Sequence, residues 1–161
     1  YEIDLVMPYG AFVSGRRGFA ETQIARVREA CGDRLLKVIL ETGEIGDPLL
    51  IHAASLLAIS AGADFIKTST GKVKVNATLE AAEIMLTVIE EIRREAGPEI
   101  GFKPAGGIRT VEDAAAYLAI ADRILGANWV AASHFRFGAS GLLDALLAAL
   151  DGREPTNAKG Y

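Results

Sequence analysis

The sequence is poor in the residues that usually cross-link or anchor a chain. Among its 161 residues there is one cysteine, Cys31, so no disulfide can form within the chain. A chain without disulfides suits a reducing compartment, and we expect a cytoplasmic protein. No apolar run is long enough to cross a bilayer and no signal peptide is visible, so no membrane partner is expected.

A strong excess of charge is also absent. The chain has 17 basic and 21 acidic residues, a net charge of −4, and its basic residues are scattered, so nucleic acid is not expected as a partner. With two histidines and one cysteine, no cluster has metal-ligand spacing, and no G-x-G-x-x-G follows a predicted strand. We therefore expect neither a metal nor another cofactor.

What the sequence does have is a rhythm of short apolar segments and longer segments with helical periodicity. Half of the residues are hydrophobic and 24% are charged, as in a globular protein. The regular alternation predicts a parallel sheet built from βα units. Strands are predicted at residues 2–7, 35–41, 63–69, 101–105 and 133–137, and helices at 18–31, 47–61, 77–96, 111–121 and 140–150.

Two architectures fit this alternation. An open, doubly wound sheet has helices on both faces, whereas a (β/α)8 TIM barrel closes eight units, in roughly 250 residues, around an interior. Successive predicted strands place ionisable side chains on one face and apolar side chains on the other. Such charges are hard to house under helices but converge inside a barrel, so the α/β fold class we expect is the barrel. The side chains are Asp4, Lys37, Lys67 and Lys103.

The chain would supply only about the last five of the eight βα units. We expect residues 1–150 to be these C-terminal units of a single barrel domain and residues 151–161 to be a flexible C-terminal tail. The first residue is not Met, and a predicted strand begins at the very start of the sequence. We therefore expect the N-terminal half of the same barrel as a partner, and a chain that is inactive alone.

Lys67 and Lys103 occupy matching places on neighbouring predicted strands. A buried lysine is unfavourable unless it is paired or takes part in chemistry. Two lysines facing one cavity hinder each other from holding a proton, and a neutral amine is a nucleophile. The pair therefore points to Schiff-base chemistry on a carbonyl substrate. The alternative is a set of buried ion pairs, in which Glu41 would be a partner for Lys37 and Asp4 would cap or pair.

Several predicted strands end in glycine and small polar residues, where backbone amides can approach an anion. Barrel enzymes often hold phosphate in the last two βα loops, and nearby Lys or Arg side chains add positive charge. The segments therefore predict a phosphate site. Its candidate residues are Gly71, Lys72, Gly106, Gly107, Arg109, Gly138 and Ser140.

Four motifs, at residues 36–44, 61–72, 101–110 and 136–140, resemble those of the deoxyribose-phosphate aldolase family. This family comprises class I (Schiff-base) aldolases with a barrel fold. The resemblance covers essentially the whole chain. One departure is Gly141, where some members carry a second serine, so the phosphate site would lose one hydroxyl donor.

The resemblance implies a role for each site residue. Lys67 would form the Schiff base, and Lys103 would help to keep it neutral and to move protons. Asp4 would take part in a proton relay and orient a water. Tyr161 would fold over the site and assist proton transfer at the enamine carbon, and Lys37 would be an additional pocket residue. The glycine-rich residues named above would bind the phosphate.

The implied reaction is the reversible cleavage of 2-deoxy-D-ribose 5-phosphate into glyceraldehyde 3-phosphate and acetaldehyde, with no cofactor. The expected partner is this small phosphosugar, and a homo-oligomer is compatible with the sequence. Two alternatives stay open: another lysine-dependent phosphosugar lyase or synthase with a barrel fold, and a non-catalytic module that binds a phosphorylated ligand.

Overall fold

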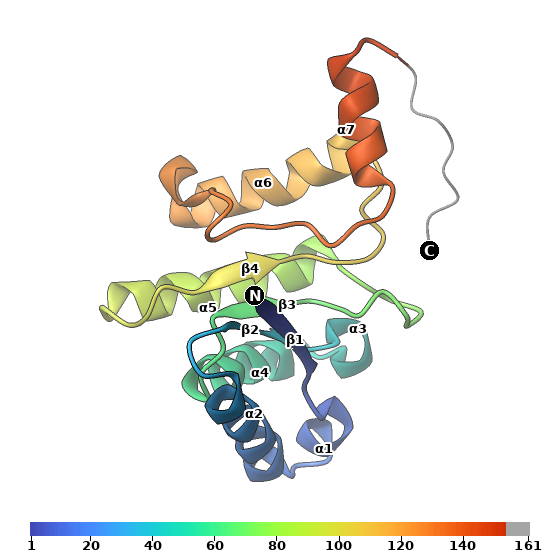
Figure 1. Cartoon of the computed structure of the whole chain (residues 1–161). Coiled ribbons are helices and arrows are strands. Elements are labelled where there is room, and N and C mark those ends of the chain that lie inside the picture. Colours follow the sequence, from blue (N-terminus) through green and yellow to red (C-terminus); the bar gives the residue numbers. More distant parts are fainter. Residues whose placement is uncertain (154–161) are drawn as a thin grey trace.

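A parallel sheet forms the centre of the molecule, and the computed structural model describes it within residues 1–153 (Figure 1). The strand order β1-β2-β3-β4 follows the sequence, as expected when a helix connects each strand to the next. The strands are β1 (Glu2–Val6), β2 (Leu35–Ile39), β3 (Phe65–Lys67) and β4 (Gly101–Lys103). The four strands are each predicted correctly, with ends that differ by up to two residues.

Helices cover the sheet on the side to which its apolar residues point. Leu36, Val38, Ile66 and Phe102 are completely buried, and they share the core with helix residues such as Met85. The helices are α1 (Tyr9–Val13), α2 (Arg17–Cys31), α3 (Thr42–Ile45), α4 (Pro48–Ser60), α5 (Leu79–Arg94), α6 (Val111–Leu125), the 3-10 turn η1 (Ala127–Trp129) and α7 (Leu142–Leu150).

The helix boundaries follow from capping. Asp47 accepts a hydrogen bond from the Leu50 N–H at the start of α4, and Thr78 does the same for Ala81 at the start of α5. At the start of α6, Thr110 and Asp113 form a complete capping box. All five predicted helices are present. Helix α6 runs four residues beyond its predicted end at 121, to Leu125.

The fifth predicted strand, at 133–137, is wrong as a strand. This segment pairs with β4 and its extension only through isolated bridges, Phe102 with Phe135 and Ala105 with Gly138. The N–H groups of Phe102 and Gly106 donate to His134 and Gly138. Pro104, which lies between them, has no N–H to donate. The ladder is therefore interrupted where the middle bond would form.

One non-glycine residue at the end of β2 has a left-handed backbone. Glu41 has φ 59° and ψ 58°, a conformation that costs a residue with a Cβ about 1–2 kcal/mol. It turns the chain from β2 into α3, and its carbonyl accepts the N–H groups of Glu44 and Ile45. The sequence gives no sign of this turn, and α3 is among the short elements that were not predicted.

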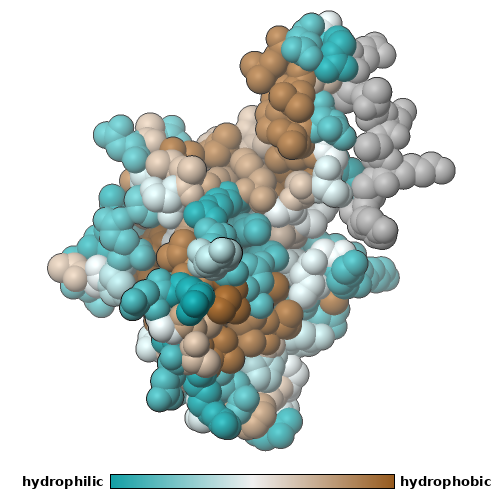
Figure 2. All heavy atoms as spheres, in the orientation of Figure 1, coloured by the Kyte–Doolittle hydropathy of each residue, from teal (hydrophilic) through white to brown (hydrophobic). Residues whose placement is uncertain are grey.

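Helix α7 stands away from the sheet and carries an apolar surface (Figures 1 and 2). Leu143, Leu147 and Leu150 are exposed on it. The expected tail spans residues 151–161, of which the structure describes 151–153. The remaining residues, 154–161, lie outside the described part of the chain. Within residues 1–153, no helix is long and apolar enough to cross a membrane.

Candidate active site

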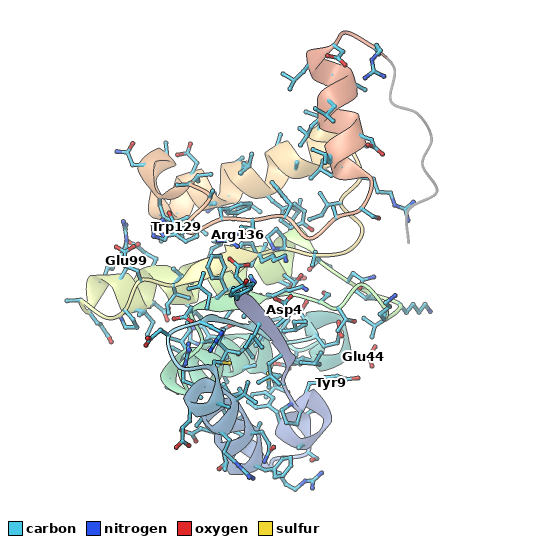
Figure 3. The ribbon with its side chains drawn as sticks, viewed as in Figure 1. Asp4, Tyr9, Glu44, Glu99, Trp129 and Arg136 are labelled. Atoms are coloured by element: carbon cyan, nitrogen blue, oxygen red, sulfur yellow. The ribbon has the colours of Figure 1, made fainter. Side chains whose placement is uncertain are left out.

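The face of the sheet opposite the helices gathers charged side chains, as the sequence predicts. Parallel pairing places Asp4 beside Lys37 on neighbouring strands, and Lys67 beside Lys103. Side chains at paired positions point to the same face of a sheet. Four adjacent strands thus contribute ionisable groups to one surface. Figure 3 labels one of these residues, Asp4 of β1.

These charges form an alternating chain of ion pairs. Arg136 donates to the Glu2 carboxylate, and Lys37 Nζ lies 2.6 Å from Glu2 Oε2. Lys37 Nζ is also 3.1 Å from Asp4 Oδ1, and Lys67 Nζ is 2.8 Å from Asp4 Oδ2. Asp4 therefore bridges two lysines. The buried Lys37 pairs with side chains of β1, so the alternative in which Glu41 is its partner is wrong.

The ion pairs set the titration of both carboxylates. Hydrogen bonds from Lys37 and then from Arg136 lower the pKa of Glu2 to about 2. Burial by itself would raise the pKa of Asp4, but hydrogen bonds from Lys67 and Lys37 outweigh burial and lower that pKa below its ordinary value. Both groups are therefore held as carboxylates at neutral pH.

Lys103 behaves differently from the lysines in the chain of ion pairs. Burial lowers the pKa of its ammonium below the ordinary value, and the positive charge of Lys67 lowers this pKa further. The surroundings of Lys103 thus favour a neutral amine. A neutral amine beside Lys67 can accept a proton from it.

The lowered pKa of Glu2 makes stability depend on pH. The folded pKa is about 2 and the ordinary value is 4.5, so the contribution of Glu2 is fully present above pH 4.5 and is lost as the pH falls through about 2. Glu2→Gln should lower the free energy of unfolding near neutral pH, and its difference from the unsubstituted protein should shrink in acid. Urea denaturation of the intact protein across this pH range measures the difference.

The matched control is Glu29→Gln, which changes an exposed glutamate of α2 in the same way. It should reproduce the pH dependence of the unsubstituted protein. A Glu2→Gln difference that stays constant from neutral pH to pH 2 would contradict the assignment.

A pocket of about 850 Å³ connects Lys67 to the glycine-rich loops. Gly106 and Gly107 have φ values of 82° and 84°, which favour glycine at both positions of the turn. All seven residues predicted to bind phosphate line this pocket: Gly71, Lys72, Gly106, Gly107, Arg109, Gly138 and Ser140. The structure therefore brings together the candidates that the sequence places far apart.

Three of the other predicted site residues, Asp4, Lys37 and Lys103, lie close to this pocket. Asp4 contacts Lys67, which lines the pocket. A Cβ built on Gly138 would lie 2.7 Å from the Ala105 Cβ and 3.3 Å from the Lys103 Cε, so glycine there allows the close approach to Ala105 and places Lys103 beside the pocket wall. Lys37 contacts the other carboxylate oxygen of Asp4. Tyr161 lies outside the described residues.

Several residues that line the pocket were not among the candidates, Thr70 and Arg153 among them. Thr70 lies within the motif at residues 61–72, and its position next to Gly71 marks it as a pocket residue. Arg153 follows α7 in a polar segment without periodicity, and no sequence signal marks it. Among the described side chains, no three His, Cys, Asp or Glu come together as a metal site.

The sheet and pocket together define a barrel-type α/β protein in which a strand lysine lies beside glycine-rich loops. The model of the DeoC/LacD family aldolases matches residues 2–148. The chain belongs to this family.

Known relatives agree with this assignment. A deoxyribose-phosphate aldolase of Agrobacterium fabrum is 58% identical over 99% of the chain. Among solved structures, the aldolase QR15 is 27% identical with a TM-score of 0.71, over 93% of this chain and 61% of its own. An apo-form structure assigned as a deoxyribose-phosphate aldolase of Toxoplasma gondii is 25% identical with a TM-score of 0.78, over 93% of this chain and 59% of its own. These structures confirm the predicted barrel-type α/β fold.

The chain is shorter than these relatives. It spans 61% of the Agrobacterium protein and between 59% and 61% of the two solved structures.

Proposed function

We propose that the intact protein is a class I aldolase that reversibly cleaves 2-deoxy-D-ribose 5-phosphate into glyceraldehyde 3-phosphate and acetaldehyde. The observation that carries this proposal is the single pocket in which Lys67 and the glycine-rich loops meet. A phosphate in the loops would leave the other end of a five-carbon sugar near the lysine amine. The Agrobacterium relative supports the choice of substrate.

The proposed reaction begins at Lys67. Its neutral amine attacks the aldehyde carbon of the open-chain sugar, and loss of water gives an iminium. The C2–C3 bond then breaks as the C3 hydroxyl loses its proton, and the bonding electrons move into the iminium to form an enamine. Protonation at C2 and hydrolysis release acetaldehyde and return the lysine amine.

Lys103 and Asp4 would serve this sequence through protons and orientation. Because burial and the Lys67 charge favour the neutral form of Lys103, its amine can accept the proton that Lys67 must lose. Asp4, at 2.8 Å from Lys67 Nζ, holds that amine in place and can orient a water. Tyr161 keeps its proposed role in proton transfer at the enamine carbon.

We also propose that further βα units complete the catalytic unit. Strand β1 lies at an edge of the sheet, and Glu2, Asp4 and Val6 are exposed. An open edge and a half-covered interior face favour pairing with another segment. An N-terminal half of the same barrel would cover both, and a homo-oligomer would add a second kind of contact. The single buried thiol, Cys31, suits the cytoplasm.

The phosphate assignment predicts a selective loss. Arg109→Ala should lower kcat/KM for the phosphorylated sugar more than for free 2-deoxy-D-ribose, because the free sugar lacks the charged group. A lost charge-assisted contact costs about 1.5–3 kcal/mol, or roughly 10- to 150-fold. Steady-state kinetics of the intact protein with both sugars measures the ratio.

The control is Arg123→Ala, which removes an exposed arginine of α6 that pairs with Glu83 at 3.0 Å, away from the pocket. It should leave the ratio unchanged. Equal losses on both sugars with Arg109→Ala would remove the phosphate assignment. Failure to condense acetaldehyde with glyceraldehyde 3-phosphate would instead favour another lysine-dependent lyase or synthase.

A further inference from the structure

Glu41 is a buried carboxylate that the proposed reaction does not use. The residue is 2% exposed, it does not line the pocket of Lys67, and its backbone is left-handed. A buried carboxyl group and a left-handed backbone are both unfavourable, and a small apolar residue would avoid the first of them. Such features concentrate where they hold a functional element in place.

The carboxylate of Glu41 binds one backbone group, the N–H of Thr70. The Thr70 nitrogen lies 3.1 Å from Oε1 and 3.4 Å from Oε2. Thr70, Gly71 and Lys72 all line the pocket, and the Lys72 N–H donates to Thr70 Oγ1 at 3.1 Å. The contact to Glu41 is therefore made at the first residue of the loop that faces the proposed phosphate.

Glu41 is itself held firmly enough to act as an anchor. Its carbonyl accepts two N–H groups of α3, and the Thr42 N–H donates to the Thr68 carbonyl at 2.9 Å. The side chain therefore projects from a fixed point between β2 and α3 toward the segment that follows β3. The left-handed backbone of Glu41 creates this geometry.

The far end of the same loop is held by other contacts. The Ala77 N–H donates to the Ala105 carbonyl at 3.2 Å, and the Asn76 side-chain amide donates to Val73 at 3.0 Å. Asn76 also packs against Gly106, where an added Cβ would lie 2.7 Å from the Asn76 Cβ. Loop residues 70–77 are thus attached at both ends, and Glu41 holds the end nearest Lys67.

We propose that Glu41 is a positioning residue for phosphate binding. It acts through Thr70, fixing the start of the loop so that Gly71 and Lys72 face the phosphate, and it does not touch the substrate. This inference rests on the proposed function, which supplies the phosphorylated substrate. It adds to that function a residue that determines the preference for phosphorylated over free sugar.

The test compares two variants of the intact protein. Glu41→Gly removes the carboxylate and tolerates the left-handed backbone, whereas Glu41→Gln keeps an oxygen that can accept from the Thr70 N–H. Glu41→Gly should weaken the binding of inorganic phosphate about tenfold by calorimetry and lower the ratio of kcat/KM for phosphorylated over free sugar by a similar factor. Glu41→Gln should restore most of both quantities.

Glu44→Ala is the matched control, because it removes an exposed acid of α3 three residues away (Figure 3). It should bind phosphate as the unsubstituted protein does. Normal phosphate binding by Glu41→Gly, or an equal loss on both sugars, would overturn the proposal. If Glu41→Gly fails to fold, Glu41→Asp, whose shorter side chain withdraws the carboxylate from Thr70, must show the same phosphate defect.

Phosphate calorimetry needs no turnover, so the two proposals fail separately. A protein that binds phosphate through Glu41 but does not cleave the sugar would contradict the aldolase function alone. A protein that cleaves the sugar while Glu41→Gly binds phosphate normally would contradict the positioning role alone.

Discussion

Lys67→Leu should abolish the covalent trapping of acetaldehyde. With the intact protein, acetaldehyde and borohydride should add one ethyl group to Lys67, because the enzyme-bound iminium is reduced to a stable amine. Leucine has no amine, so both trapping and turnover should disappear. Intact mass measurement followed by peptide mapping locates the modification.

The control for trapping is Lys74→Leu, which removes an exposed lysine seven residues further along the chain. It should be trapped at Lys67 to the same extent as the unsubstituted protein. Modification found only on exposed lysines, or persisting in Lys67→Leu, would disprove the assignment of the Schiff base.

Lys103→Leu should slow turnover by about two to four orders of magnitude, the range in which positioned acid–base groups contribute. Because the pKa of Lys103 is lowered, its neutral amine becomes available as the pH rises, and activity should rise with it. The variant should lose this limb of the pH–rate profile. Steady-state kinetics across pH, with slow trapping of the Lys67 imine as a second measurement, tests the role.

Lys103→Arg separates the proton-transfer role from a simple charge effect. Arginine keeps the positive charge but does not give up its proton in proteins. It should therefore be about as slow as Lys103→Leu. Near-normal activity of Lys103→Arg, or an unchanged pH profile in Lys103→Leu, would show that Lys103 is not the proton acceptor.

The sequence correctly predicts the parallel sheet and many of the residues that line the pocket. Apolar residues alternate with Asp4, Lys37, Lys67 and Lys103, and parallel strands bring their carboxyl ends to one edge. The glycine motifs lie just beyond those ends. Local pattern and topology are therefore enough to gather Lys67 and the glycine-rich loops around one pocket.

What the sequence does not predict depends on contacts between distant side chains. Lys37 has Glu41 four positions away, yet it pairs with Glu2 and Asp4 because β1 and β2 lie side by side. Because Lys37 pairs with these residues of β1, the Glu41 side chain can accept a hydrogen bond from the Thr70 N–H instead. A strand at 133–137 would need a hydrogen bond from the backbone N–H of residue 104, which follows β4, and Pro104 has no N–H. The apolar pattern of residues 133–137 contains no information about this distant proline.

The in-register pairing of β3 with β4 has a consequence for how this sequence can change over time. The backbones of Lys67 and Lys103 are about 4.8 Å apart because hydrogen bonds between strands set that spacing. Helix surfaces can therefore exchange most of their residues without moving the two amines. A one-residue insertion inside β4 would turn Lys103 toward the helices, whereas the same insertion at residues 95–100, before the strand, would be absorbed by the loop. Length changes among relatives should thus be frequent just outside these short strands and rare within them.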